Sequence, residues 1–145
     1  ALNYENSTSQ SVLKQMQKLV DKYSLHRNVI FITDFIEKQE IVKILHLADL
    51  LVLPYDHLEE GASGAVRYCL ASERPVIVSE SPIFRDRTDA VVRIPNNNPD
   101  TITTAVKQLL EDRELYNKQI KSGRKFVGRN SWESKSRLYL QLIAK

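Results

Sequence analysis

The sequence has 145 residues, of which 42% are hydrophobic and 27% charged, with a net charge of +3, as is typical of one soluble globular domain. No apolar run approaches the ~20 residues of a membrane span, and no signal-peptide pattern opens the chain. Its single cysteine, Cys69, excludes an internal disulfide. We therefore expect a cytoplasmic protein in a reducing compartment.

The charge is unevenly distributed. Residues 113–145 hold nine Lys or Arg and two Glu, a net charge of +7, which leaves −4 for the rest of the chain. We expect this basic segment to be the solvated surface of two terminal helices, with contact to anionic lipid headgroups or a charged polymer as the alternative. Nucleic acid is not an expected partner, because the basic residues are not interleaved with exposed aromatics and no nucleic-acid motif is present.

Apolar residues at helical spacing predict helices over 12–23 and 41–48. A third helix should begin after Ser63 as N-cap. Its inner face would hold Ala65, Val66, Cys69 and Leu70.

A fourth helix should follow the loop 96–99, with Asp100 in its first turn. Its supporting apolar residues would be Ile102, Val106, Leu109 and Leu110. Two further helices, about 113–128 and 132–144, complete the chain, with Ser131 as N-cap of the last.

Short apolar runs predict four strands, at 29–32, 50–53, 75–78 and 91–94. Helices alternating with such strands indicate an α/β, Rossmann-like doubly wound fold with a parallel sheet. In a sheet ordered 3-2-1-4-5-6 these would be strands three to six, and the first strands would lie upstream of Ala1. We therefore expect residues 1–145 to form a single domain of a longer, two-domain protein.

The run "EEGASGAVRYCLASERPVIVSE", residues 59–80, is the most informative stretch. It follows the strand "LLVLPY" and places a carboxylate and a small-residue loop directly before a helix. Free N–H groups and the helix dipole at such a turn attract anions. The run therefore predicts an anion-binding hinge at the carboxyl end of a strand.

From about residue 11 to 142, the chain resembles the C-terminal, donor-binding domain of GT-B-fold glycosyltransferases of the retaining family 4 (group 1) type. "NVIFITDF" resembles that family's "v.F.G.v", and "LHLADLLVLPY" resembles its "a.aDvfvlPS". The run at 59–80 resembles "EGfGl..lEAma.G.PVIas", and "D...I..AV..LLED" and "SW" fit its closing helices. The resemblance lies in the ordered set rather than in any one piece.

The resemblance implies that Glu60 is the first glutamate of the family's E-x7-E motif, which holds donor-sugar hydroxyls, and that Gly61 is the glycine after it. Tyr68 stands where the second glutamate usually holds the nucleotide ribose. A phenol makes one hydrogen bond and cannot clamp two hydroxyls as a carboxylate does. The motif also departs at Ser63, which replaces its second glycine, and at Asp34, which replaces the glycine before the base-binding turn.

By the same resemblance, the backbone amides of Ala62, Ser63 and Gly64 hold the donor diphosphate without a metal or other cofactor. Phe35 and Ile36 form the turn that receives the base. The Arg and Lys pair that such enzymes place on the diphosphate would come from a loop upstream of this chain. The D-x-x-D spacing of Asp86 and Asp89 does not match the D-x-D metal site of the other glycosyltransferase fold.

Structural explanations stand beside these roles. Glu60 follows Glu59 and could be surface charge, Gly61 and Gly64 could serve only turn geometry, and Tyr68 could pack on a neighbour. We expect the nucleotide-sugar-binding half of a metal-independent, retaining glycosyltransferase, with the acceptor bound mainly to an absent N-terminal domain. The alternatives are a sugar-nucleotide epimerase of the same fold and a non-catalytic, receiver-like module. A receiver-like module would need an acidic pair after its first strand and a lysine after a late strand, and neither is evident in this sequence.

Overall fold

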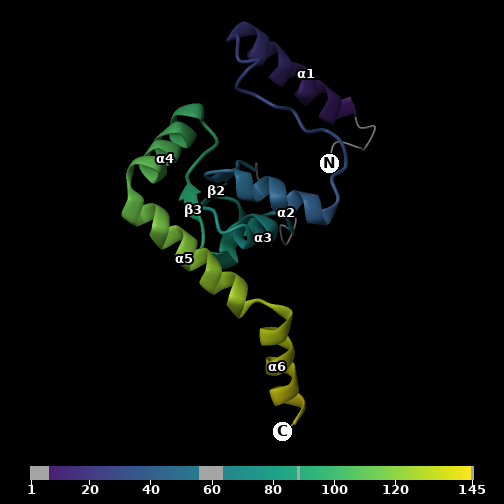
Figure 1. The fold of residues 1–145 in the computed structure, drawn as a ribbon, viewed down its shortest axis with the longest axis vertical. Coiled ribbons are helices and arrows are strands. Elements are labelled where there is room, and N and C mark those ends of the chain that lie inside the picture. The colour runs from purple at the N-terminus through teal and green to yellow at the C-terminus, as the bar shows by residue number, and fades with distance from the viewer. Residues whose placement is uncertain (1–6, 56–63, 88, 145) are drawn as a thin grey trace. The chain divides into compact units, whose positions relative to one another are not determined.

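The computed structural model describes residues 7–55, 64–87 and 89–144 (Figure 1). The chain divides into two compact units, residues 1–40 and 41–145.

The first unit contains the predicted first helix, α1 (Ser7–Lys22). The strand predicted at 29–32 is wrong, because this segment is irregular. Ile30 is 86% exposed and Ile32 56%. A strand needs a neighbour that accepts and donates its backbone hydrogen bonds, and no described segment pairs with these residues. The apolar run alone therefore does not form a strand.

The second unit is built on three parallel strands, β1 (Leu51–Leu53), β2 (Val76–Ser79) and β3 (Val92–Ile94). Their order is β1-β2-β3, so β2 is central. All four of its residues are buried, as a strand covered on both faces requires. The prediction of an α/β fold with a parallel sheet is confirmed, and so are three of the four predicted strands.

Helices cover both faces of this sheet. Residues of α2 (Lys38–Leu47), α3 (Gly64–Ala71) and α5 (Arg113–Arg129) pack on one face, and residues of α4 (Pro99–Glu111), with Leu115 of α5, pack on the other. The two largest buried side chains are Phe84 and Leu70. Side chains alternate along β2, so that Val76 and Val78 join the first cluster and Ile77 the second. This is the doubly wound arrangement.

Two predicted core positions are wrong. Ala65 is exposed, whereas Val66, Cys69 and Leu70 of α3 are buried. Leu110 is 56% exposed, whereas Leu109 is buried. Each misplaced residue directly precedes or follows a buried one, about 100° around a helix of 3.6 residues per turn.

The connection from β2 to β3 is partly helical. It contains a 3-10 helix, η1 (Pro82–Arg87), whose Ile83 and Phe84 are buried. The Arg93 guanidinium of β3 donates to the carbonyl of Phe84 and fixes η1 to the strand. The ring of Phe84 also contacts Tyr55, with centroids 5.5 Å apart. The connection therefore contributes to the core.

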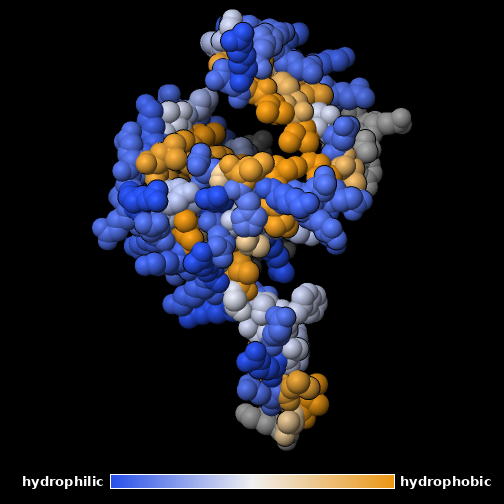
Figure 2. All heavy atoms as spheres, in the orientation of Figure 1, coloured by the Kyte–Doolittle hydropathy of each residue, from blue (hydrophilic) through white to orange (hydrophobic). Residues whose placement is uncertain are grey.

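The chain ends with α5 and α6 (Trp132–Ile143), each with a side-chain N-cap. Ser131 caps α6, as predicted, by accepting the Ser134 N–H at 3.2 Å. The second half of α6 exposes several large apolar side chains, and Figure 2 shows hydrophobic atoms gathered there. No helix among the described residues combines the length and apolar character that a transmembrane span requires.

The cap of α5 gives a stability prediction. Asp112 accepts the Leu115 N–H at 2.9 Å. We expect Asp112→Ala to lower the free energy of unfolding by about 1 kcal/mol, because that N–H loses its acceptor at the helix start. Asp112→Asn should stay near the wild type, since asparagine caps equally well. Urea unfolding checks both variants, and equal stability of Asp112→Ala and wild type would contradict the assignment.

Candidate functional site

The carboxyl ends of the three strands meet at one edge of the sheet, where open α/β proteins bind ligands. A pocket of about 350 Å³ lies there, and we call it the edge pocket. Its lining residues follow β1, β2 and β3 or end them: Tyr55, Ser79, Glu80, Pro95, Asn96, Asn97 and Asn98.

The backbone carbonyl of Tyr55 joins the three strand ends. It accepts a hydrogen bond from Ser79 Oγ at 2.5 Å and another from Asn97 Nδ2 at 3.2 Å. The Glu80 N–H continues the pairing of β2 and β3 by donating to the Ile94 carbonyl at 2.9 Å. Because Ser79 is buried, its hydroxyl is well shielded from water and the bond is hard to replace. The edge pocket is therefore held by contacts between distant parts of the chain.

The asparagines around the start of α4 have different roles. Asn96 Oδ1 accepts from the Asn98 N–H at 3.0 Å and from Thr101 Oγ1 at 2.9 Å, which fixes the turn into the helix. Asn98 is the N-cap residue, yet its side chain makes no capping hydrogen bond. Its carboxamide is exposed beside the edge pocket, where it can bind a ligand.

Four predicted site residues, Glu60, Gly61, Ala62 and Ser63, lie outside the described residues. Gly64 is the first residue of α3, with a negative-φ backbone and nothing within 4 Å of an added Cβ. Neither conformation nor crowding among the described residues requires glycine at this position. Its role as an amide donor at the helix start stays a prediction.

Tyr68 lies in α3 and is half-buried. Phe35 and Ile36 belong to the first unit, where Phe35 is 64% exposed and Ile36 half-buried. Phe35 and Ile36 belong to the unit of residues 1–40, and Tyr68 belongs to the unit of residues 41–145. Their predicted contacts with ribose and base stay predictions.

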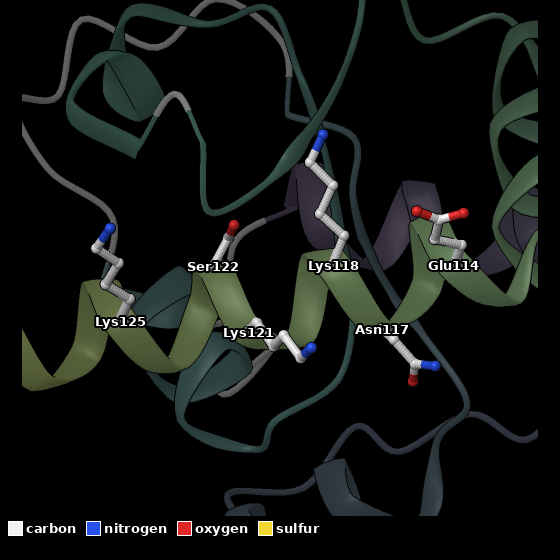
Figure 3. Close-up of a pocket in the computed structure, with 6 residues that line it drawn as sticks. All are labelled: Glu114, Asn117, Lys118, Lys121, Ser122 and Lys125. Carbon is white, nitrogen blue, oxygen red and sulfur yellow. The ribbon is translucent and has the colours of Figure 1, made fainter.

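A second hollow, of about 560 Å³, lies along α5 (Figure 3). Its described lining comes from that helix alone: Glu114, Asn117, Lys118, Lys121, Ser122 and Lys125. In Figure 3, Lys118 and Lys125 point to one side of the helix, whereas the Lys121 side chain runs along it. These cations do not converge on one point, so the hollow has the geometry of a solvated basic surface rather than of a phosphate site.

No group of three or more His, Cys, Asp or Glu side chains that could hold a metal ion occurs within residues 7–55, 64–87 and 89–144. Cys69 is a buried residue of α3, and desolvation by that burial raises the pKa of its thiol to about 11, against an opposing backbone hydrogen bond. Cys69 is therefore a small core residue, as predicted.

The comparison with family models decides the family. Residues 9–126 match the model "Glycosyl transferases group 1". The chain belongs to the group 1 glycosyltransferases. No sequence among the curated proteins matches this one significantly.

Two solved structures show the same fold. Sucrose-phosphate synthase from Thermosynechococcus elongatus aligns with 98% of this chain at a TM-score of 0.76 and 21% identity. The C-terminal domain of a group 1 glycosyltransferase from Francisella tularensis aligns with 86% at 0.73 and 18%. This group 1 glycosyltransferase chain covers 37% of the first protein and 65% of the second. The likeness confirms a GT-B glycosyltransferase domain fold.

The edge pocket was not predicted from the sequence. The sequence feature that could have indicated it is a run of three consecutive asparagines, 96–98, shortly after a predicted strand. Side chains that follow parallel strands share one edge, so Glu80 and these asparagines could have been grouped from the topology. The contact of Asn97 with Tyr55, 42 positions away, could not have been predicted from the sequence.

Burial of Cys69 predicts low thiol reactivity. A pKa of about 11 instead of 9.0 leaves roughly 100-fold less thiolate at pH 8, and the thiolate is the reacting form. We expect an aromatic disulfide reagent to modify the folded chain at least 100-fold more slowly than the chain in guanidinium. Equal rates in the two conditions would place Cys69 at the surface.

Proposed function

We propose that this domain binds a nucleotide-diphosphate sugar for metal-independent, retaining glycosyl transfer. Family membership over residues 9–126 carries the proposal. The position of α3 supports it, because this helix begins at Gly64, eleven residues after β1 ends at the carboxyl edge of the sheet. A strand end followed by a helix start is suited to a diphosphate.

The proposed chemistry needs a grip on the sugar and a stabiliser for the leaving diphosphate. Glu60 accepts hydrogen bonds from donor-sugar hydroxyls and so orients the anomeric carbon. The amides of Ala62, Ser63 and Gly64 donate to the diphosphate, whose negative charge grows as its bond to the sugar breaks. Tyr68 offers the ribose one hydrogen bond, whereas the carboxylate usual at this position in the family can bind two hydroxyls.

The acceptor, a saccharide or lipid-linked molecule, would bind mainly to a further domain, with transfer in the cleft between the two. The coverage of the solved relatives supports this, since the chain spans 37% of one and 65% of the other. We propose a cytoplasmic enzyme. On its own, this domain is expected to bind donor weakly and to transfer no sugar.

We also propose peripheral contact with an anionic membrane surface. Lys118, Lys121 and Lys125 are exposed on α5, and α6 exposes Trp132 and Ile143, at 89% and 80%. Basic side chains near apolar ones are typical of interfacial helices. Sedimentation with vesicles of 30% anionic lipid tests this, and lack of binding at low salt would contradict it.

The test of the main proposal is Glu60→Ala in the enzyme that joins this domain to its acceptor domain. We expect at least a tenfold loss of turnover with an unchanged melting temperature, because the donor sugar loses its orientation. The matched control is Glu59→Ala, one residue earlier in the same loop, which should keep wild-type turnover. Unchanged activity of Glu60→Ala would refute the sugar-gripping role.

A further inference from the structure

The described lining of the edge pocket shares no residue with the proposed donor site, which comprises Phe35, Ile36, residues 60–64 and Tyr68. We propose that the edge pocket binds one neutral saccharide unit through its hydroxyl groups. Its volume of about 350 Å³ lies at the small end of the range for ligand pockets, about 300–1,000 Å³.

The charge of the lining selects against phosphates. None of the described residues that line the edge pocket is Lys, Arg or His, and Glu80 is the one acidic side chain among them. A carboxylate repels a phosphate and accepts hydrogen bonds from hydroxyls. The edge pocket therefore differs in chemistry from the helix start of α3, where an anion is favoured.

The polar groups match a sugar, whose hydroxyls each donate and accept. Glu80 is exposed at the end of β2 and offers two acceptor oxygens. Asn98 offers two donors and an acceptor, since its carboxamide is not used in capping α4. Donors and acceptors from separate segments thus line one hollow.

These groups sit on a fixed frame. The Tyr55 carbonyl accepts hydrogen bonds from both Ser79 and Asn97, and the Asn96 side chain stabilises the turn before α4 by accepting two hydrogen bonds. Backbone that is ordered before binding costs little entropy when the ligand arrives. The structure is therefore suited to weak but specific binding of a monosaccharide.

The edge pocket could bind other neutral polar ligands, and our assignment of a saccharide to it rests on the proposed function in glycosyl transfer. The sugar of the donor and a sugar of the acceptor share the same chemistry, so the experiment distinguishes them.

The experiment follows backbone amide shifts of the ¹⁵N-labelled 145-residue chain. D-glucose, D-mannose and N-acetyl-D-glucosamine are each added to 100 mM. We expect at least one to shift the amides of Glu80 and residues 96–98 with a millimolar dissociation constant. Glucose 6-phosphate should bind at least threefold more weakly than glucose.

Two variants and one control localise the site. Glu80→Gln and Asn98→Ala should each weaken binding at least threefold, and Asn98→Ala should fold normally because that side chain makes no capping bond. Glu114→Gln on α5, matched in chemistry to the first variant, should bind like the wild type. No shift with any of the three sugars, or no effect of Glu80→Gln, overturns the inference.

Nucleotide titrations separate the sources and the two proposals. If UDP shifts only residues 64–68 and UDP-glucose shifts the edge pocket as well, the ligand is the donor sugar. If UDP-glucose leaves the edge pocket unchanged while a free sugar occupies it, the ligand is an acceptor sugar. If a free sugar binds there but neither nucleotide shifts residues 64–68, the inference stands and the proposed donor site fails.

Discussion

The second unit depends on the pairing of β2 with a parallel neighbour on each side. β2 is buried along its whole length, and its side chains enter a separate apolar cluster on each face of the sheet. Its register with β1 and β3 brings the three carboxyl ends to one edge. The Tyr55 carbonyl then fixes that edge through Ser79 and Asn97. Without this pairing there would be no edge pocket.

Local features of the fold were readable from the sequence because their causes are local. Apolar periodicity located the helices, continuous apolar runs located β1, β2 and β3, and Ser131 marked the start of α6. The segment 29–32 has the same composition but no described pairing partner, so its strand did not form. The burial of Phe84 in η1 depends on contacts with Tyr55 and Arg93, which no local pattern reveals.

The candidate site likewise has one part with a local sequence pattern and one part that depends on contacts between distant residues. The hinge before α3 was predicted from a run of adjacent residues and from its resemblance to group 1 glycosyltransferases, and it stays a prediction because residues 59–63 lie outside the described residues. The match over 9–126 confirms the family. The edge pocket joins Tyr55, Glu80 and Asn98, which are far apart in the chain, and only the folded sheet brings them together. We propose opposite preferences for the two regions: a helix start favours the charged diphosphate, and a carboxylate with carboxamides favours neutral hydroxyls. A donor with a charged and a neutral end is suited to such a surface.

The most direct test of the central claim is a thermal-shift panel of UDP-, GDP- and ADP-glucose on this domain. A ligand that binds only the folded state raises the melting temperature by an amount that grows with the ratio of its concentration to its dissociation constant. The account predicts that at least one nucleotide sugar raises it at 10 mM, and that free glucose at the same concentration raises it less. A melting temperature that none of the three nucleotide sugars changes would contradict donor binding by this domain.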